Sequence, residues 1–179
     1  RRKGLVPPGS TGPAAVGYRH IRNNLRLLVA EDPPRTIMVT SAEPREGRST
    51  LVANLAVVLA RAGRQVGVVD ADLRRPRIAE LLEVPAQPGL VDVTQGDVAL
   101  EDVVQTTGDG RLVVVPAGEP PEDPDLVLAS RSTAALLAKV RVDNEFVLID
   151  APPLLPLADA GSLAVAADGG PAGGPVRLD

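Results

Sequence analysis

The sequence predicts an α/β domain in which helices flank a parallel sheet. Three observations predict it: a strand, a loop and a helix in succession, two later apolar strands that each end on an aspartate, and an aliphatic core. The 179 residues include one Phe, one Tyr and no Trp, so the core must come from Val, Leu, Ile and Ala. Such aliphatic runs are typical of parallel strands that helices cover on both faces. The length suits one domain.

The first unit of the predicted fold is the strand, loop and helix at residues 37–60. Apolar residues 37–39 predict a buried strand, and residues 51–60 predict a helix, with Asn54 expected on its surface or at a phosphate edge. Gly47 in the loop would let the backbone approach a ligand closely. The N–H groups of such a loop, together with the helix N-terminus, favour a bound phosphate.

The loop departs from the strict phosphate-loop pattern G-x-x-x-x-G-K-S/T at two positions. Ala42 stands in place of the first glycine, and Arg48 stands in place of the lysine. Taken alone, the segment is explained more simply as an ordinary strand-to-helix turn with Ser49 near the helix start. The rest of the chain has to decide between these two interpretations.

Two later strands are expected to bring aspartates to the same edge of the sheet. Residues 65–70 end on Asp70, with Asp72 two residues later, and residues 147–150 end on Asp150. Open α/β sheets bind ligands at the carboxyl ends of their strands, and carboxylate oxygens near a triphosphate suit Mg²⁺. Each aspartate alone could cap the next turn. Three of them beside a phosphate-type loop are much harder to assign to capping.

At these three segments the chain resembles the bacterial tyrosine kinases of capsule and exopolysaccharide biosynthesis, which are relatives of the MinD and ParA ATPases. That family has a Walker A loop T-S-x-x-P-x-E-G-K-S/T, a Walker A′ motif D-x-D-x-R and a Walker B motif ending D-S/T-P-P. Here the motifs read T-S-A-E-P-R-E-G-R-S-T from Thr40, D-A-D-L-R from Asp70 and D-A-P-P from Asp150. The resemblance implies a P-loop NTPase-like fold.

Two further segments extend the resemblance over residues 17–169, which are predicted to form the kinase-like domain. Residues 18–25 resemble the family's E-x-x-R-x-x-R helix, used in ring-like self-association, but Val16 stands in place of the glutamate. A homo-oligomer is therefore left open. Residues 116–126 resemble the family's connection into a helix, with Asp123 placed to cap that helix and Pro124 at its first position.

The two ends of the chain are expected to be irregular. Residues 1–16 are predicted to form a flexible leader and residues 170–179 a disordered tail, because Gly and Pro dominate that tail. The family would continue into more sheet and a tyrosine cluster, so the domain is expected to be truncated on its C-terminal side. We expect roughly five parallel strands, at about 36–41, 65–70, 111–115 and 145–150, with the fifth not placed.

The resemblance implies an ATP-dependent protein-tyrosine kinase that regulates polysaccharide chain length and export, with ATP and Mg²⁺ as cofactors. It implies that the nucleotide phosphates are held by Pro44, Arg45, Glu46, Gly47, Arg48, Ser49 and Thr50. It implies that Mg²⁺ is held by Ser49, Asp70, Asp72 and Asp150. The catalytic residues it implies are Arg48, Asp70 and Asp72, with Asp72 as the base.

Two other interpretations stay open. One is a regulatory ATPase or nucleotide-binding module similar to MinD or ParA and without kinase activity, which Arg48 and the missing tyrosine tail favour. The D-x-D-x-R element and the two prolines after Asp150 favour the kinase. The other is a truncated product that does not fold.

The expected partners are a tyrosine-containing protein substrate and a membrane-anchored polysaccharide chain-length regulator, either fused or separate. The net charge of -4 and pI of about 5.1 argue against a nucleic-acid partner. The family places the chain in the cytoplasm at the inner face of the plasma membrane, and the absence of Cys is compatible with this. Residues 1–3 could be a juxtamembrane basic patch, but a solvated tail is favoured because recognisable patches hold about four to eight charges.

Overall fold

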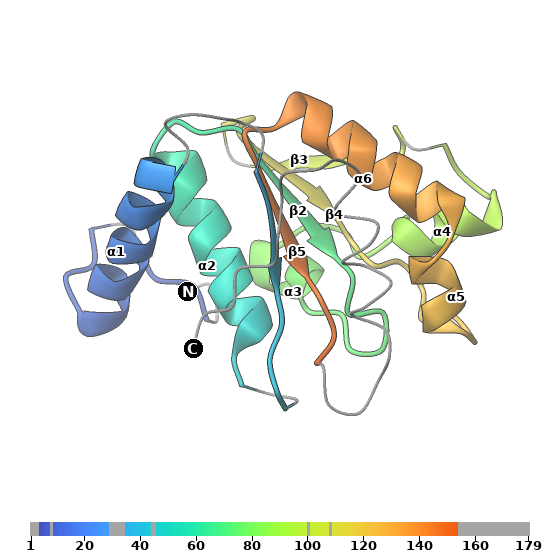
Figure 1. Ribbon diagram of the computed structural model, residues 1–179, viewed down its shortest axis with the longest axis horizontal. Coiled ribbons are helices and arrows are strands. Elements are labelled where there is room, and N and C mark those ends of the chain that lie inside the picture. The colour runs from blue at the N-terminus through green and yellow to red at the C-terminus, as the bar shows by residue number, and fades with distance from the viewer. Residues whose placement is uncertain are drawn as a thin grey trace.

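The computed structural model describes residues 4–7, 9–28, 35–43, 46–99, 101–107 and 109–153. They form one five-stranded sheet in the order β1-β5-β2-β4-β3, with helices on both faces (Figure 1). The strands are β1 (Arg35–Val39), β2 (Val66–Asp70), β3 (Gln105–Thr107), β4 (Leu112–Val115) and β5 (Phe146–Asp150). The helices are α1 (Pro13–Leu28), α2 (Arg48–Arg61), α3 (Ile78–Leu82), α4 (Leu90–Gln95), α5 (Pro124–Leu128) and α6 (Arg131–Asp143).

The four strands that the sequence placed are confirmed, and they run parallel as β1, β5, β2 and β4. The expectation that all five strands are parallel is wrong, because β3 pairs antiparallel with β4. The chain passes from Thr107 to Leu112 in a short connection. Such a connection permits an antiparallel neighbour only, since a parallel one needs a crossover of about a dozen residues.

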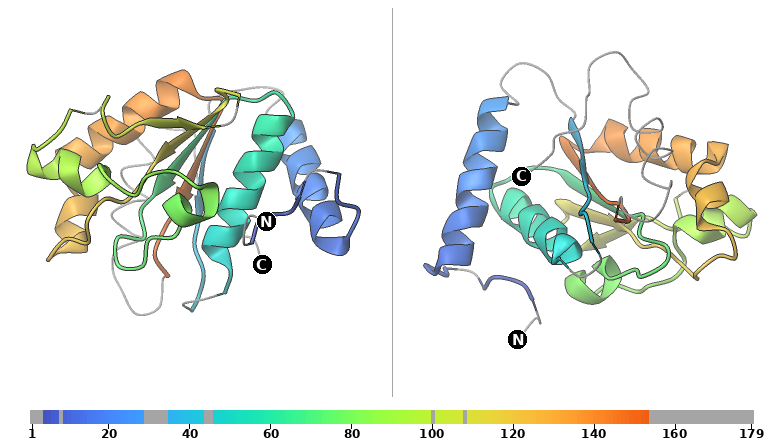
Figure 2. Two further views of the ribbon diagram at one scale, coloured as in Figure 1. Left: turned by 180° about the vertical axis from the view of Figure 1, so that it is seen from behind. Right: turned by 60° about the horizontal axis from the view of Figure 1, so that its bottom comes forward.

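The sheet separates two apolar layers. The helices that contribute to these layers lie on either side of the sheet in Figure 2. Because side chains alternate along a strand, Phe146 and Leu148 of β5 face the layer of α2 and α3. Val147 and Ile149 face the layer of α4, α5 and α6. The aliphatic core that composition predicted therefore forms on both faces of the sheet.

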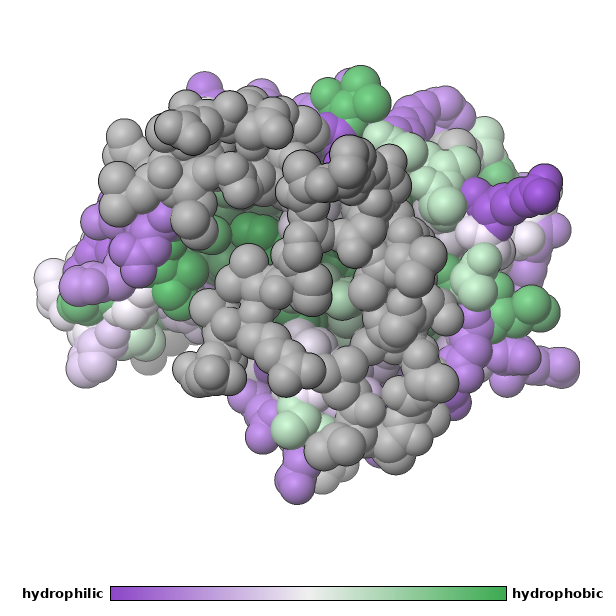
Figure 3. Space-filling view, viewed as in Figure 1, coloured by the Kyte–Doolittle hydropathy of each residue, from purple (hydrophilic) through white to green (hydrophobic). Residues whose placement is uncertain are grey.

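On the face drawn in Figure 3, hydrophilic side chains near α1 and around α4 to α6 lie among scattered hydrophobic ones. The large hydrophobic side chains exposed among these residues are Val16, Leu126 and Val142. Within the described part of the chain, no helix combines the length and the apolar character that crossing a membrane requires.

The predicted cap of α5 is confirmed. The Asp123 carboxylate accepts hydrogen bonds from the backbone N–H groups of Asp125 and Leu126, both at 3.1 Å, and Pro124 is the first helical residue. These two bonds satisfy N–H groups that the first turn of a helix leaves without an intrahelical partner.

Part of the segment that the sequence predicted as a leader contacts the domain. Asn54 of α2 is 2% exposed, and its Nδ2 donates to the carbonyl of Gly4 at 2.9 Å. The backbone N–H of Val6 donates to Asn54 Oδ1 at 2.6 Å, while Leu5 packs against the core. Asn54 is thus neither on the helix surface nor at the phosphate edge, because residues 4–6 cover it. The division of the chain at residues 16 and 169 stays a prediction, although α1 already begins at Pro13.

An Asn54→Ala variant is expected to lose about 1 to 2 kcal/mol of unfolding free energy, because the backbone groups of Gly4 and Val6 lose their partners. Urea denaturation followed by circular dichroism measures this loss. Asn24→Ala is the matched control, since Asn24 is an exposed asparagine on α1. Equal midpoints for the two variants would show that the bonds to residues 4–6 do not stabilise the fold.

Candidate nucleotide and metal site

The three sequence motifs meet at one edge of the sheet. β5 lies between β1 and β2, and Asp150 aligns with Val39 of β1 and with Asp70 of β2. The carboxyl ends of these strands therefore share an edge, which is where open parallel sheets bind ligands. α2 starts beside it at Arg48, following the loop that leaves β1.

The start of α2 suits a phosphate. Gly47 has φ 84° and ψ 12°, a left-handed conformation that glycine adopts without strain, and an added Cβ would meet nothing within 4 Å. The first turn has no acidic residue and no side-chain cap. Its N–H groups lack intrahelical partners and point towards the N-terminus, as anion-binding helices require. This geometry fits the predicted phosphate contacts of Ser49 and Thr50.

The other predicted loop residues provide less support for a phosphate site. Glu46 is exposed, and its carboxylate accepts a hydrogen bond from the Glu43 N–H at 3.2 Å. Pro44 and Arg45 lie outside the described residues. Their predicted roles, like those of the other site residues, stay predictions.

Arg48 turns its side chain into the aspartate cluster and is only 8% exposed. Its Nε donates to Asp150 Oδ1 at 2.7 Å, and one Nη group donates to Asp72 Oδ2. The other Nη group donates to Ser41 Oγ at 3.2 Å. The structure thus brings together three predicted site residues, Arg48, Asp72 and Asp150, as a buried network of one cation and two carboxylates.

Asp150 is fully buried, and its Oδ2 has no hydrogen-bond partner among the described residues. Burial raises the pKa of this carboxyl, although the Arg48 charge and the nearby Ser49 hydroxyl lower it. A carboxylate with one unpartnered oxygen, together with a nearby serine hydroxyl, is a suitable set of hard donors for Mg²⁺. The residues present therefore fit the predicted ion at Ser49 and Asp150.

Asp70 is also fully buried, but its carboxylate turns towards the backbone. Its Oδ2 accepts from the N–H groups of Arg77 at 3.0 Å and Ile78 at 2.9 Å, and its Oδ1 from Asp72 N–H at 3.3 Å. Burial and the negative charge of Asp150 raise the pKa of Asp70 to about 8, against the opposing effect of the hydrogen bonds from Ile78 and Arg77. Asp70 thus holds the loop that carries Asp72.

Because the Asp70 carboxylate turns towards the backbone, fewer carboxylates are left for a metal ion than the sequence predicted. Over the described ranges, no group of three or more Asp, Glu, His or Cys side chains is arranged to hold a metal ion. The carboxylates that remain for a metal ion are those of Asp72 and Asp150, and both are bonded to Arg48. The metal and catalytic roles of Asp70 stay predictions.

Two residues before the loop contribute to the site without having been assigned a role from the sequence. Thr40 Oγ1 donates to the Pro152 carbonyl at 2.8 Å, which ties the end of β1 to the segment after β5. Ser41 Oγ contacts both Arg48 and the Glu43 carbonyl, the latter at 2.8 Å. In the sequence, only the T-S pair that opens the first motif pointed to a role for Thr40 and Ser41.

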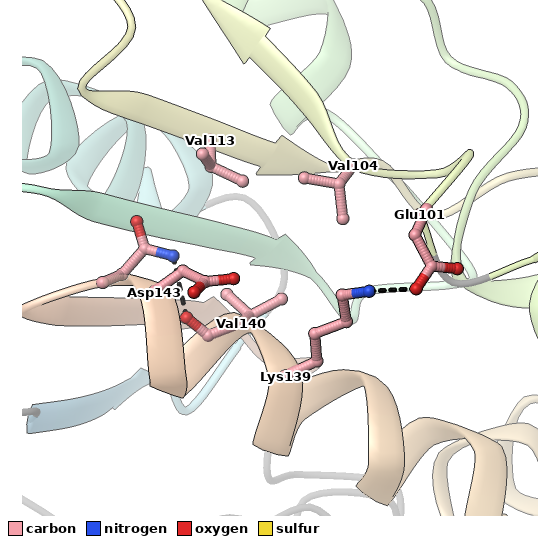
Figure 4. A pocket seen from close by; sticks show the side chains of 7 residues that line it. Glu101, Val104, Val113, Lys139, Val140 and Asp143 are labelled. Atoms are coloured by element: carbon pink, nitrogen blue, oxygen red, sulfur yellow. Dashed lines mark hydrogen bonds and ion pairs between the residues drawn. The ribbon is translucent and has the colours of Figure 1, made fainter.

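A pocket of about 220 Å³ lies between β4 and α6 and contains none of the predicted residues. Lys139 of α6 and Glu101 form an ion pair at its side, and Val104, Val113 and Val140 line its apolar part (Figure 4). Asn144, which also lines it, precedes β5, so the pocket lies towards the amino ends of the strands. It is separate from the aspartate edge.

Comparison with known proteins gives matches along most of the chain. The family model described as ParA, NUBPL iron-transfer P-loop NTPase, matches residues 33–115. The chain is 36% identical over 152 residues to the tyrosine-protein kinase YwqD of Bacillus subtilis (strain 168). That alignment covers 85% of this chain and 64% of YwqD, so the chain spans less than two thirds of the relative.

Two solved kinase domains have the same fold. The kinase domain of VpsO is 32% identical and superimposes with a TM-score of 0.76 over 87% of this chain and 76% of that domain. The kinase domain of the Escherichia coli tyrosine kinase ETK is 28% identical, with a TM-score of 0.82 over 93% of this chain and 67% of that domain. The predicted fold class is therefore confirmed.

Proposed function

We propose that this chain, which belongs to the family of bacterial tyrosine kinases related to the ParA ATPases, transfers the γ-phosphoryl group of ATP to tyrosine hydroxyls of partner proteins. The observation that supports this most strongly is the meeting of Arg48, Asp72 and Asp150 at the N-terminus of α2. A phosphate-binding helix end, a cation and two carboxylates at one point are the groups that phosphoryl transfer uses.

Each group has a proposed role. Pro44 shapes the start of the loop, the backbone N–H groups of residues 45–50 hold the phosphates, and the Arg48 guanidinium, which suits phosphate oxygens, neutralises their charge. Ser49 and Asp150 hold Mg²⁺, assisted by Asp72 and, through the loop it anchors, Asp70. When bound, the ion offsets negative charge on the phosphates.

Asp72 is the proposed general base. It is 5% exposed, and its Oδ1 accepts the Arg75 N–H at 3.2 Å, which fixes the carboxylate. A carboxylate held beside the phosphate site can accept the proton of an attacking tyrosine hydroxyl. Asp70 keeps the Asp72 loop in place through the Asp72 N–H bond.

The partners and location are proposals of the same kind. The substrate is a tyrosine-containing protein, and the chain works with a membrane-anchored regulator of polysaccharide chain length at the inner face of the plasma membrane. Self-association through α1 is less supported, because Arg19 donates to the Ser10 carbonyl at 2.9 Å and Arg22 to Asn23 at 3.1 Å. Both arginines therefore bond within the chain.

A second candidate function is a nucleotide-binding module or ATPase without kinase activity. Arg48 favours it, because a planar, longer guanidinium replaces the compact ammonium of lysine. A displacement of about 1 Å at a reacting centre can reduce the rate on the order of a hundredfold. The match to a ParA family model supports the same alternative.

The test is the fate of γ-labelled ATP incubated with the chain, Mg²⁺ and a tyrosine-rich acceptor peptide. We expect label on tyrosine, reduced at least about 100-fold by Asp72→Asn because the base is lost. Asp143→Asn, which alters an exposed aspartate of α6, should keep the wild-type rate. Label released only as free phosphate would favour the ATPase, and label that stays on ATP would reject both the kinase and the ATPase, leaving only a module that binds nucleotide.

A further inference from the structure

We infer that Arg48 is an internal counter-cation that excludes free divalent metal from the nucleotide-free site and gives way only when nucleotide phosphates bind its guanidinium. This inference rests on the proposed function, because it needs Asp150 and Asp72 to face a metal ion. It adds an order of binding: the ion enters together with the nucleotide rather than ahead of it.

The geometry of the guanidinium is the first support. Nε, one Nη and the other Nη each reach a different side chain, namely Asp150, Asp72 and Ser41. The fork of an arginine presents donors in fixed directions, whereas lysine offers a single compact charge. The replacement of lysine by arginine therefore permits one side chain to bridge both carboxylates.

The charge of the site is the second support. The Arg48 side chain is 8% exposed, and those of Asp72 and Asp150 are 7% and 0% exposed, so the ion pairs are shielded from solvent. A divalent ion bound to these carboxylates would lie next to the guanidinium and be repelled by it. Breaking a buried pair without replacing the lost partner is strongly unfavourable. A free metal ion that took the carboxylates would leave the Arg48 guanidinium without a negatively charged partner.

The unpartnered oxygen of Asp150 is the third support. Oδ2 is buried and lacks a hydrogen-bond partner within the described residues, while Oδ1 is bonded to Arg48. Buried polar atoms normally find a partner. Oδ2 is thus available to bind a cation, while in the nucleotide-free site the positive charge beside Asp150 is that of Arg48.

Nucleotide phosphates supply what free metal lacks. Arg48 is the first residue of α2, at the helix end where the phosphates are proposed to bind. Phosphate oxygens accept paired hydrogen bonds from a guanidinium, so Arg48 can exchange its carboxylate partners for phosphate. Asp72 and Asp150 are then free for the ion.

The test measures Mn²⁺ binding by electron paramagnetic resonance on the nucleotide-free chain. Arg48→Met keeps much of the side-chain length and removes the charge that repels the ion, so it should bind Mn²⁺ at least about tenfold more tightly than the wild type. Arg64→Met is the matched control, because Arg64 pairs with Glu145 at the opposite end of the sheet. It should bind Mn²⁺ as weakly as the wild type. Adding ADP should make the wild type bind Mn²⁺ more tightly than ADP alone binds the ion.

Equal Mn²⁺ binding by wild type and Arg48→Met without nucleotide would overturn the inference while leaving the proposed function intact, provided that ADP promotes Mn²⁺ binding. If neither chain binds Mn²⁺ even with ADP, the proposed metal site itself fails, and the inference fails with it. The two failures are therefore distinguishable.

A second measurement covers the case in which Arg48→Met does not fold. In nitrogen-15 spectra of the wild type, the Arg48 Nε–H signal can be assigned by its absence in Arg48→Lys, which keeps the charge. We expect this signal to be protected from solvent exchange without nucleotide, to persist in excess Mg²⁺, and to shift when ADP is added. The inference would be overturned if the Arg48 Nε–H exchanged rapidly with solvent without nucleotide. It would also be overturned if adding Mg²⁺ alone removed the protection.

Discussion

Truncating Phe146 to alanine is expected to lower the free energy of unfolding by about 3 to 5 kcal/mol. Phe146 is the only phenylalanine, is fully buried, and belongs to the apolar layer that α2 and α3 form with the sheet. It stands on β5, between β1 and β2, next to Val66. The aliphatic neighbours cannot fill the space of a lost ring, so a cavity adds to the lost burial.

Urea denaturation followed by far-ultraviolet circular dichroism measures the effect. Leu126→Ala is the control, because Leu126 is 70% exposed on α5 and should change stability by less than about 0.5 kcal/mol. Since Asp150 ends the same strand as Phe146, the Phe146→Ala chain should also bind nucleotide more weakly near its unfolding midpoint. Equal urea midpoints for the two variants would show that burial of Phe146 does not stabilise the fold.

A Gly89→Ala change is expected to destabilise the fold by about 3 kcal/mol or more. A Cβ on Gly89 would lie 2.2 Å from the Gly118 nitrogen, 2.5 Å from the Pro116 oxygen and 2.6 Å from the Ala117 carbonyl carbon. All three are backbone atoms, which cannot rotate away as the end of a side chain can. The segment before α4 therefore has to separate from the segment after β4.

This separation would break two hydrogen bonds that join α4 to the end of β4. The N–H of Leu90 donates to the Pro116 carbonyl at 2.9 Å, and the N–H of Val91 to the Ala117 carbonyl at 3.0 Å. Gly17→Ala is the control: Gly17 lies inside α1, where an added Cβ meets nothing within 4 Å. That variant should gain up to about 1 kcal/mol, because alanine favours a helix over glycine. A Gly89→Ala chain with wild-type thermal stability would show that the two segments separate easily.

The buried acids of the site work against stability. Burial raises the pKa of both Asp70 and Asp150, which means that the fold disfavours their ionised forms. Arg48 opposes this for Asp150, and the N–H groups of Arg77 and Ile78 oppose it for Asp70. Shifted pKa values of this kind are concentrated at functional sites, in agreement with the position of these residues at the edge where open parallel sheets bind ligands.

Several features of the protein follow from the sequence by itself. Apolar runs and their bounding turns predicted the strands that became β1, β2, β4 and β5, because strand formation by aliphatic residues is a local preference reinforced by burial. The Asp123 cap and Pro124 predicted the start of α5 for the same local reason. The aspartates at two strand ends predicted one common edge, since parallel strands place their carboxyl ends together.

The tertiary structure alone decided where the side chains of the site turn. Asp70 uses its carboxylate to hold backbone N–H groups seven and eight residues away, and Asn54 binds residues 4–6, some 50 positions earlier. Arg48 bridges to Asp150, 102 residues along the chain. The direction of a polar side chain depends on which distant donors and acceptors packing brings within hydrogen-bond reach, and no local pattern encodes that. The sequence thus determined the four parallel strands and the edge at which the candidate site lies, while the packed sheet decided that β3 pairs antiparallel with β4 and that Arg48 lies between the carboxylates.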